Sequence, residues 1–215
     1  MSMILAIDTA SPSVMAVGLG SSSGDVIEVA AAGGVREQGT QVITLIDQIV
    51  GSRRQDIDAI AVISGPGSYA GLRIGIATAQ SLGLGLGRPV VGAGTFEAVR
   101  EAAGNRILHA IHPAGRGEWA IQREPGERAV TAAPRELGDP ALLAGEGSSA
   151  LGGTEVSPEA RVAALLRIAA RLLLSGEAID PVAPYYLREP NISRPKRTPL
   201  VAGTRQQLRS TKRNG

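Results

Sequence analysis

The chain has 215 residues, a length that fits one ordinary domain or two small lobes. Apolar residues make up 43% of it and aromatic residues only 2%, so the core must be built mainly from Ala, Val, Ile and Leu. There is no cysteine, which excludes disulfides and thiolate metal sites. The net charge of +2 is unevenly spread: residues 1–189 carry fifteen basic and twenty acidic residues, and residues 190–215 carry seven basic and none acidic.

The first half of the chain predicts a strand at 4–7, a polar turn, and two further strands near 14–19 and 26–32. The N-terminus has no basic region and no run approaches the roughly 18 apolar residues of a membrane span, so we expect a cytoplasmic protein without membrane contact. An amphipathic helix follows at about 42–50, because its apolar residues recur at helical spacing. A buried strand is predicted within 58–64.

A glycine-rich turn then leads into a helix made largely of small residues. A short strand at 89–94 and a helix from Thr95 complete this half. In the second half, strands are predicted at 107–111 and 118–122, followed by a short helix near 134–137. Its longest helix starts at Ser157, with Pro158 next, and ends near Gly176.

These elements predict an α/β protein of two lobes. We place an N-terminal lobe at 1–103, a smaller C-terminal lobe at 104–189 and a basic tail at 190–215. The segment 181–189 is expected to be extended.

Asp8 ends the first buried strand, just before a turn, where an acid is placed to meet a ligand at the carboxyl end of a sheet. The alternative is that Asp8 caps the turn through the backbone amides of Thr9 or Ser11.

The turn at 65–68 raises a similar choice, because backbone amides at a glycine turn before a helix form an anion cradle. Asp8, Thr9, Gly65, Gly67, Ser68 and Arg73 are therefore the candidate anion-proximal residues, and a purely structural turn is the alternative. His109 and His112 are three residues apart on a predicted strand, so their rings face opposite ways and we expect no shared metal. No residue cluster predicts catalysis or metal binding.

The helix after the turn has almost no side chain along one ridge, where Gly71, Gly75, Ala79 and Gly83 recur every four residues. Each helical glycine costs roughly 1 kcal/mol relative to alanine, so another backbone is expected to approach this ridge closely. That backbone belongs either to a partner or to the protein's own sheet.

The chain resembles the bacterial TsaB (YeaZ) family in four stretches. In chain order they are ILAIDTASPSVMAVGL, REQGTQVITLIDQIV, GPGSYAGLRIGIATAQSLGLG and PYYLRE. The resemblance is close over residues 3 to about 103 and good at 184–189, but loose over 104–180. It implies the actin-like ATPase fold, of sugar-kinase and Hsp70 type, with a reduced second lobe.

The resemblance also implies a function: a non-catalytic subunit for making threonylcarbamoyladenosine (t6A) at position 37 of tRNAs that read ANN codons. Its implied partners are the catalytic subunit TsaD, the ATPase TsaE and, through the complex, tRNA; the isolated chain is expected as a monomer or homodimer. No cofactor is implied, apart from ATP or ADP at a shared interface. The family's contact helices match 36–50 and 71–85, so the predicted interface comprises Val42, Ile43, Ile46, Ile49, Gly71, Gly75, Ala79 and Gly83.

The chain departs from the family where Gln38-Gly39 replaces a histidine and where His112 stands in place of an acid. The second departure weakens the alternative function, a stand-alone actin-like ATP-dependent enzyme or glycopeptidase-like hydrolase. The basic tail is either a tRNA contact or a solvated segment. Its candidate residues are Arg194, Lys196, Arg197, Arg205, Arg209, Lys212 and Arg213.

Overall fold

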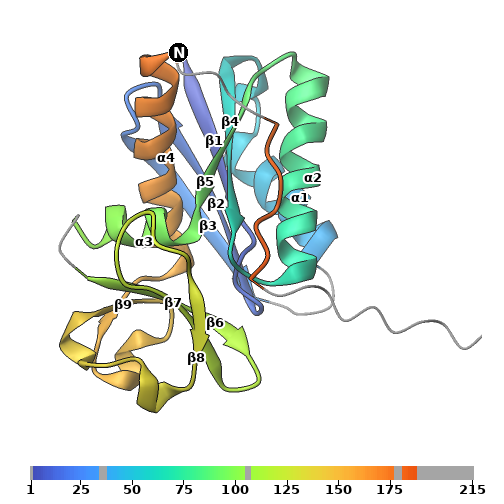
Figure 1. Ribbon diagram of the computed structural model, residues 1–215. Helices are drawn as coiled ribbons and strands as arrows, with labels where there is room; N and C mark the ends of the chain where they lie inside the picture. Colours follow the sequence, from blue (N-terminus) through green and yellow to red (C-terminus); the bar gives the residue numbers. More distant parts are fainter. Residues whose placement is uncertain (1, 34–37, 105–107, 177–180, 188–215) are drawn as a thin grey trace, which may run out of the picture.

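Two five-stranded sheets form the framework of the protein in a computed structural model, which describes residues 2–33, 38–104, 108–176 and 181–187 (Figure 1). The elements of the first sheet and its connections are β1 (Met3–Asp8), β2 (Val14–Ser21), β3 (Val26–Gly33), α1 (Gln38–Val50), β4 (Ile57–Gly65), α2 (Tyr69–Leu86) and β5 (Val90–Gly94). The remaining elements are α3 (Thr95–Ala102), β6 (His109–Gly115), β7 (Glu118–Gln122), β8 (Val130–Ala132), β9 (Leu143–Gly145), β10 (Thr154–Glu155) and α4 (Pro158–Ser175). Short 3-10 turns lie at Arg53–Asp56, Pro134–Glu136, Pro140–Leu142 and Ser148–Leu151.

The two sheets share one topology. The first has the order β3-β2-β1-β4-β5, with β1, β2 and β3 antiparallel and β4 and β5 parallel to β1. The second has the order β8-β7-β6-β9-β10, with the same pattern of directions around β6. This repeated unit is the organisation expected of a two-lobe actin-like fold, and the second copy is reduced to shorter strands.

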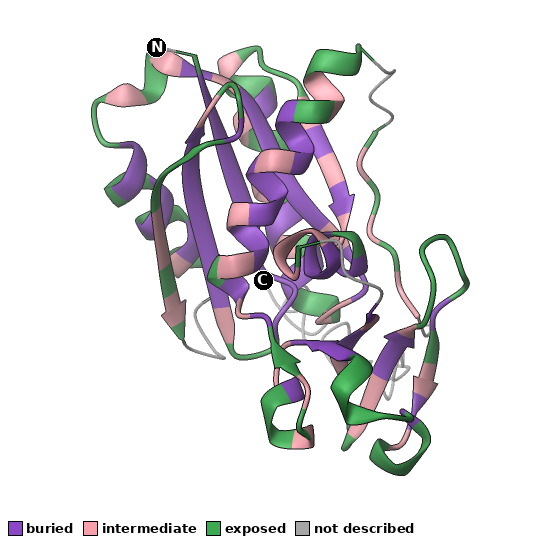
Figure 2. Cartoon of the chain, turned by 90° about the vertical axis from the view of Figure 1, so that its left-hand side faces the viewer, coloured by how far each residue is buried: buried purple, intermediate pink, exposed green. Residues whose placement is uncertain are grey.

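Strands β1, β2 and β4 of the first sheet are buried on both faces and appear mainly purple in Figure 2, whereas the edge strand β3 is largely exposed. Because side chains alternate along a strand, Met3, Leu5 and Ile7 of β1 face the side covered by α1 and α2. Ile4 and Ala6 face the other side, which is covered by α4. The next residue on that second side is Asp8, so the alternation directs its carboxylate toward α4.

The predicted domain division needs one change, because α4 does not stay with the second sheet. It packs on the first sheet, where Gly18 and Gly20 of β2 let it approach closely. A Cβ at position 18 would lie 2.4 Å from Val162 Cγ1. Residues 104–176 therefore contribute both a small lobe and a helix of the large one.

The extended segment 181–187 also lies on the first lobe, beside β4 and α2 (Figure 1). Tyr185 N–H donates to Ser64 O at 2.7 Å, and Gln80 Nε2 donates to Val182 O at 2.9 Å. The segment also lies against the start of the glycine turn, because a Cβ at Gly65 would lie 2.4 Å from Tyr185 O. Among the described residues no helix is both long enough and apolar enough to span a bilayer.

Candidate functional site

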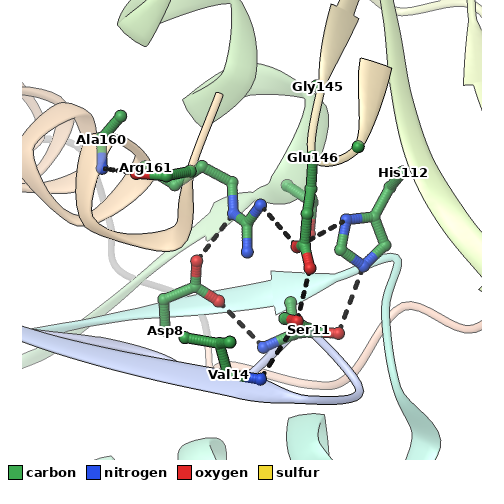
Figure 3. A network of polar contacts seen from close by, with 12 residues as sticks. Asp8, Ser11, Val14, His112, Gly145, Glu146, Ala160 and Arg161 are labelled. Atoms are coloured by element: carbon green, nitrogen blue, oxygen red, sulfur yellow. Dashed lines mark hydrogen bonds and ion pairs between the residues drawn. The ribbon is translucent and has the colours of Figure 1, made fainter. Parts of the chain in front are cut away.

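Asp8 combines the predicted turn cap with an ion pair that the sequence did not reveal. Its carboxylate is fully buried, and Oδ1 accepts the backbone N–H of Ala10 at 2.8 Å. The cap is therefore present, made through Ala10 rather than through Thr9 or Ser11. Asp8 Oδ2 accepts Arg161 Nε at 2.7 Å (Figure 3).

Arg161 stands in the first turn of α4, which begins as predicted. Ser157 is the N-cap, its Oγ accepting the N–H of Ala160 at 3.3 Å, and Pro158 follows. The Arg161 side chain is fully buried, and its Nη1 donates to Glu146 Oε2 at 2.9 Å. The guanidinium thus bridges two carboxylates, and their charges raise the pKa of Arg161 although burial alone would lower it.

Glu146 is held by the tight turn after β9. Gly145 has φ +154°, and a Cβ there would lie 1.9 Å from Ile111 O, so only glycine lets β9 approach β6 this closely. Glu146 Oε1 accepts the Ser11 hydroxyl at 2.6 Å. This bond connects the second lobe to the β1–β2 turn of the first.

His112 completes the cluster from β6. Its ring is 1% exposed, and Nε2 lies 3.2 Å from Ala10 O. Because a carbonyl only accepts, Nε2 carries the proton and Nδ1 is an acceptor, 3.9 Å from Glu146 Oε2. Burial, and secondly the charge of Arg161, lowers the pKa of His112 to about 3, so the ring is neutral at pH 7.

His109 lies apart from this cluster, in agreement with the predicted opposite orientation of the two histidines. Its Nδ1 is 3.2 Å from Arg123 O, near the edge of the second sheet. Within the described ranges no three metal-type side chains gather into a binding group. The expected absence of a metal site stays a prediction.

The glycine turn before α2 makes internal contacts. Ser68 N–H donates to Ala10 O at 2.7 Å, and Ser68 Oγ caps α2 by accepting Gly71 N–H. Arg73 points away from the turn: its guanidinium lies 5.5 Å from the Tyr69 ring centre and donates to the Tyr69 hydroxyl. These partners favour the structural interpretation of the turn, and anion binding there remains a prediction.

The interpretation of the small-residue ridge of α2 as a partner-docking face is corrected by burial. Gly71, Gly75, Ala79 and Gly83 are all buried. A Cβ at Gly71 would lie 2.0 Å from Thr9 O, and one at Gly75 would lie 2.2 Å from Thr9 Oγ1. The approaching backbone is the protein's own β1–β2 turn, and Thr9 Oγ1 donates to Gly71 O at 2.7 Å.

The predicted stripe on α1 needs the same correction at three of its four positions. Val42, Ile46 and Ile49 are buried in the core between α1 and the first sheet. Ile43 is 51% exposed, whereas the other predicted interface residues are buried. Periodicity identifies an apolar face, but not whether its partner lies inside the same chain.

Between α1 and α2 lies an apolar groove of about 380 Å³. Ile43, Asp47 and Arg54 border it from the α1 side, and Ser81, Leu82 and Gly85 from α2. Leu84, one residue away on α2, is 87% exposed. Of the predicted interface residues, Ile43 and Ile46 line this groove, whereas Leu84 and the groove residues of α2 were not predicted.

The sequence analysis missed Arg161 and Glu146. A signal for Arg161 was present, since it lies four residues before Leu165 on the apolar face of α4, where a charge needs a buried partner. The candidate tRNA contacts Arg194, Lys196, Arg197, Arg205, Arg209, Lys212 and Arg213 lie outside the described residues.

The two sheets of matching topology give the protein the two-lobe architecture of the actin-like fold. YeaZ from Pseudomonas aeruginosa shares the fold, with a TM-score of 0.65 at 22% identity, covering 87% of this chain and 100% of that one. The family model of TsaD: tRNA N6-adenosine threonylcarbamoyltransferase matches residues 28–136, just over half of the chain. The chain belongs to this family, and the relative described next identifies it as a member of the TsaB (YeaZ) group.

That relative is the tRNA threonylcarbamoyladenosine biosynthesis protein TsaB of Escherichia coli K12, 36% identical over 84 residues. The match covers 35% of this chain and 36% of the relative. A tRNA N6-adenosine threonylcarbamoyltransferase of Bartonella henselae is 38% identical over 61 residues, 28% of this chain and 16% of that protein. The chain thus spans about a third or less of the length of these curated relatives.

Proposed function

We propose that this chain is a non-catalytic subunit in t6A formation, which binds a TsaD-type catalytic subunit and activates it on tRNAs reading ANN codons. The observation that carries the proposal is the exposed apolar surface of α1 and α2. Family membership supports the pathway, and this surface supports the mode of action.

The surface has the features of a helix-binding site. Ile43 and Leu84 are among the most exposed large apolar side chains of the described residues, and the groove lies between the helices that carry them. A soluble chain leaves such a groove open where another apolar face covers it in the assembly. Helices of a partner subunit are suited to fill it, since their apolar side chains recur at the spacing of a groove between two helices.

The interlobe cluster supports a non-catalytic role. Both Asp8 oxygens are already hydrogen-bonded within the chain, one to Ala10 and one to Arg161. A buried carboxylate with these partners is not available to orient a metal-bound phosphate. The alternative of a stand-alone ATP-dependent enzyme predicts ATP turnover by the isolated chain, which a phosphate-release assay measures.

The proposal includes further assembly partners. A TsaE-type ATPase would join the pair, ATP or ADP would bind at the shared interface, and tRNA would be reached through the complex and the basic tail. In isolation, the same α1–α2 surface would support a homodimer. Deleting residues 194–215 and measuring tRNA affinity of the complex at two salt concentrations tests the contribution of the tail.

Charge substitutions on the α1–α2 surface test the proposal directly. Ile43→Asp and Leu84→Asp should each weaken binding to the TsaD-type subunit by about tenfold or more, because each places a charge in an apolar contact. The t6A content of tRNA, measured by mass spectrometry in a reconstituted reaction, should fall in parallel. Melting temperatures of the isolated variants should stay close to that of the parent, since both side chains are exposed.

Val130→Asp provides the matched control. Val130 is 48% exposed on β8 of the second lobe, far from the groove in the fold. It should leave binding and t6A formation unchanged. Equal binding by all three variants would exclude the α1–α2 surface as the interface.

A further inference from the structure

The three tyrosines of the chain gather in one region, although aromatic residues make up only 2% of the sequence. Tyr69 begins α2, and Tyr185 and Tyr186 lie on the extended segment that runs beside this helix (Figure 1). The ring centroids of Tyr69 and Tyr186 are 4.8 Å apart, and the Arg73 guanidinium lies over the Tyr69 ring. Tyr69 is 42% exposed. In a chain with so few aromatic side chains, such a group at the surface indicates a binding surface.

Tyr69 and Tyr186 line a groove of about 300 Å³ where the two lobes meet. Residues 66–68 of the glycine turn border it from the first lobe, and the end of β6 borders it from the second. Asp8 and Arg161 do not line it. Its volume is at the lower end of the range for small-molecule sites, so the groove has room for one flat ring rather than for a whole nucleotide.

The charges around this groove suit an anionic ligand. Among the described residues, none that lines the groove carries a carboxylate, whereas Glu97 and Glu101 line the neighbouring pocket beside Tyr185. Leu187 borders the groove, and the chain continues from there into residues 190–215, which contain seven basic residues and no acidic one. An anionic chain in the groove would therefore meet no carboxylate of these lining residues, and a basic segment follows one of them in the sequence.

An arginine lies near the groove on each lobe. Arg73 is one helical turn after Tyr69 on α2, and Arg116 lies at the tip of the β6–β7 turn, next to Gly115 of the groove lining. Arg116 has φ +57°, a left-handed conformation that is uncommon for residues other than glycine, and Gly117 after it has φ +75°. Arg116 is exposed, so its guanidinium is accessible to a phosphate beside the groove.

From these observations we propose that the groove binds an unstacked base of a single-stranded RNA. The base stacks on the rings of Tyr69 and Tyr186, and Arg73 and Arg116 contact the phosphates that flank it. Proteins hold unpaired RNA bases by stacking them on aromatic rings and guanidinium groups, because every base has a flat face. Since the chain belongs to a family that modifies tRNA, we expect this RNA to be tRNA. That identity rests on the proposed function, whereas the affinity of the groove for single-stranded RNA does not.

Substitutions of the two rings test the stacking. Tyr69→Leu and Tyr186→Leu each remove one ring but keep an apolar side chain, so each should weaken RNA binding by about tenfold. The probe is a fluorescent single-stranded oligonucleotide of about ten nucleotides, titrated with the full chain and followed by anisotropy. Tyr69→Phe keeps the ring and should bind RNA like the parent, which separates stacking from a hydrogen bond made by the hydroxyl.

Tyr185→Leu is the matched control. Tyr185 follows the same extended segment and is 45% exposed, but it lines the neighbouring pocket. Its backbone N–H keeps the bond to Ser64 O in the variant, so RNA affinity should equal that of the parent. If Tyr186→Leu lowers the melting temperature, Tyr69→Leu decides the result, because the exposed Tyr69 ring can be removed without opening the core.

The salt dependence of binding tests the contribution of Arg116. Arg116→Gln should lower the slope of log affinity against log salt concentration by about 0.7, because one phosphate contact is lost. Arg135→Gln is the control for this loss of charge. Arg135 is 87% exposed on the second lobe and does not line the groove, so the slope should not change.

Photocrosslinking locates the bound base directly. An oligonucleotide that carries iodouracil should crosslink to Tyr69 or Tyr186, which mass spectrometry of the digested chain identifies. Unlabelled RNA duplex and ATP should compete weakly with the oligonucleotide, because the bases of a duplex are stacked and ATP lacks the flanking phosphodiester chain.

Three results would overturn the proposal: parent-like RNA affinity of both Tyr69→Leu and Tyr186→Leu, an equal loss of affinity in Tyr185→Leu, or displacement of the oligonucleotide by ATP as efficiently as by unlabelled oligonucleotide. All titrations use the isolated full chain, and binding to a TsaD-type subunit is measured separately. A chain that binds RNA but no such subunit would contradict only the proposed function, and the reverse result would contradict only this inference.

Discussion

The two sides of α2 differ in what their residues contact. On the inner side, Gly71 and Gly75 lie against Thr9 of the β1–β2 turn, and Gly83 lies against Val90. On the outer side, Leu84 is exposed, and a Cβ added at Gly85 would have nothing within 4 Å. Both sides contain glycine, yet only the inner glycines are required by close packing.

This difference shows how a small-residue helix is to be interpreted. A ridge of glycines indicates that something approaches closely, and here that neighbour is the turn following β1. This β1–β2 turn also positions Asp8 and Ala10, which take part in the polar cluster between the lobes. The ridge is thus linked to the joining of the lobes, while the surface that we propose for a partner is formed by larger side chains outside it.

The largest expected effect is on the inner side of α2. Gly71→Ala should lower the free energy of unfolding by about 3 kcal/mol, because its Cβ would meet the backbone carbonyl of Thr9, which cannot rotate away. Urea unfolding followed by circular dichroism measures this. A loss under about 0.5 kcal/mol would show that the turn and α2 do not pack tightly against each other in solution.

The second expected effect is a pH dependence of stability, which arises from the buried His112 beside the β1–β2 turn. The pKa of His112 is lowered from 6.5 to about 3 on folding, so between these values the unfolded chain binds a proton that the folded chain does not. The free energy of unfolding should therefore decrease by up to about 1.4 kcal/mol for each unit that the pH is lowered below 6.5. His112→Gln should remove this part of the slope in urea unfolding measured from about pH 7 to pH 5.

His109→Gln is the control for that experiment, since it makes the same change at the histidine outside the cluster. The pH dependence of the free energy of unfolding should persist in His109→Gln. A slope of the same size in the His112 variant would assign the pH dependence to other groups.

The smallest effect is expected on the outer side of α2. Gly85→Ala should raise the free energy of unfolding by about 0.5–1 kcal/mol, because the position is helical and nothing lies within 4 Å of the added Cβ. Thermal unfolding of the two glycine variants side by side provides the comparison. Destabilisation by both would mean that the outer side is also covered in the isolated chain.

Much of the fold was predictable because local patterns determine it. The apolar run at 4–7, the helical spacing within 42–50 and the Ser157-Pro158 start of α4 all agree with the elements observed. The two-lobe α/β class followed from the order of these elements and from the family resemblance. The return of α4 to the first sheet was not predictable, since its apolar face fits either lobe.

The candidate site was predictable only in part. Asp8 and the glycine turn each had a local signal, whereas the pairing of Asp8 with Arg161 joins residues 153 positions apart. The interface prediction named mostly buried residues of α1 and α2, and binding of a partner to these helices stays a prediction.

Local spacing and composition were thus enough to establish which segments are helices and strands and which faces are apolar. Tertiary structure alone decided which face packs inside the chain and which remains exposed, and it alone brought two carboxylates to one guanidinium. The reason is physical: hydrophobic burial is not directional, so a pattern shows that a face is buried but not against what. A buried charge, in contrast, requires one specific partner, and that partner is known only once the chain has folded.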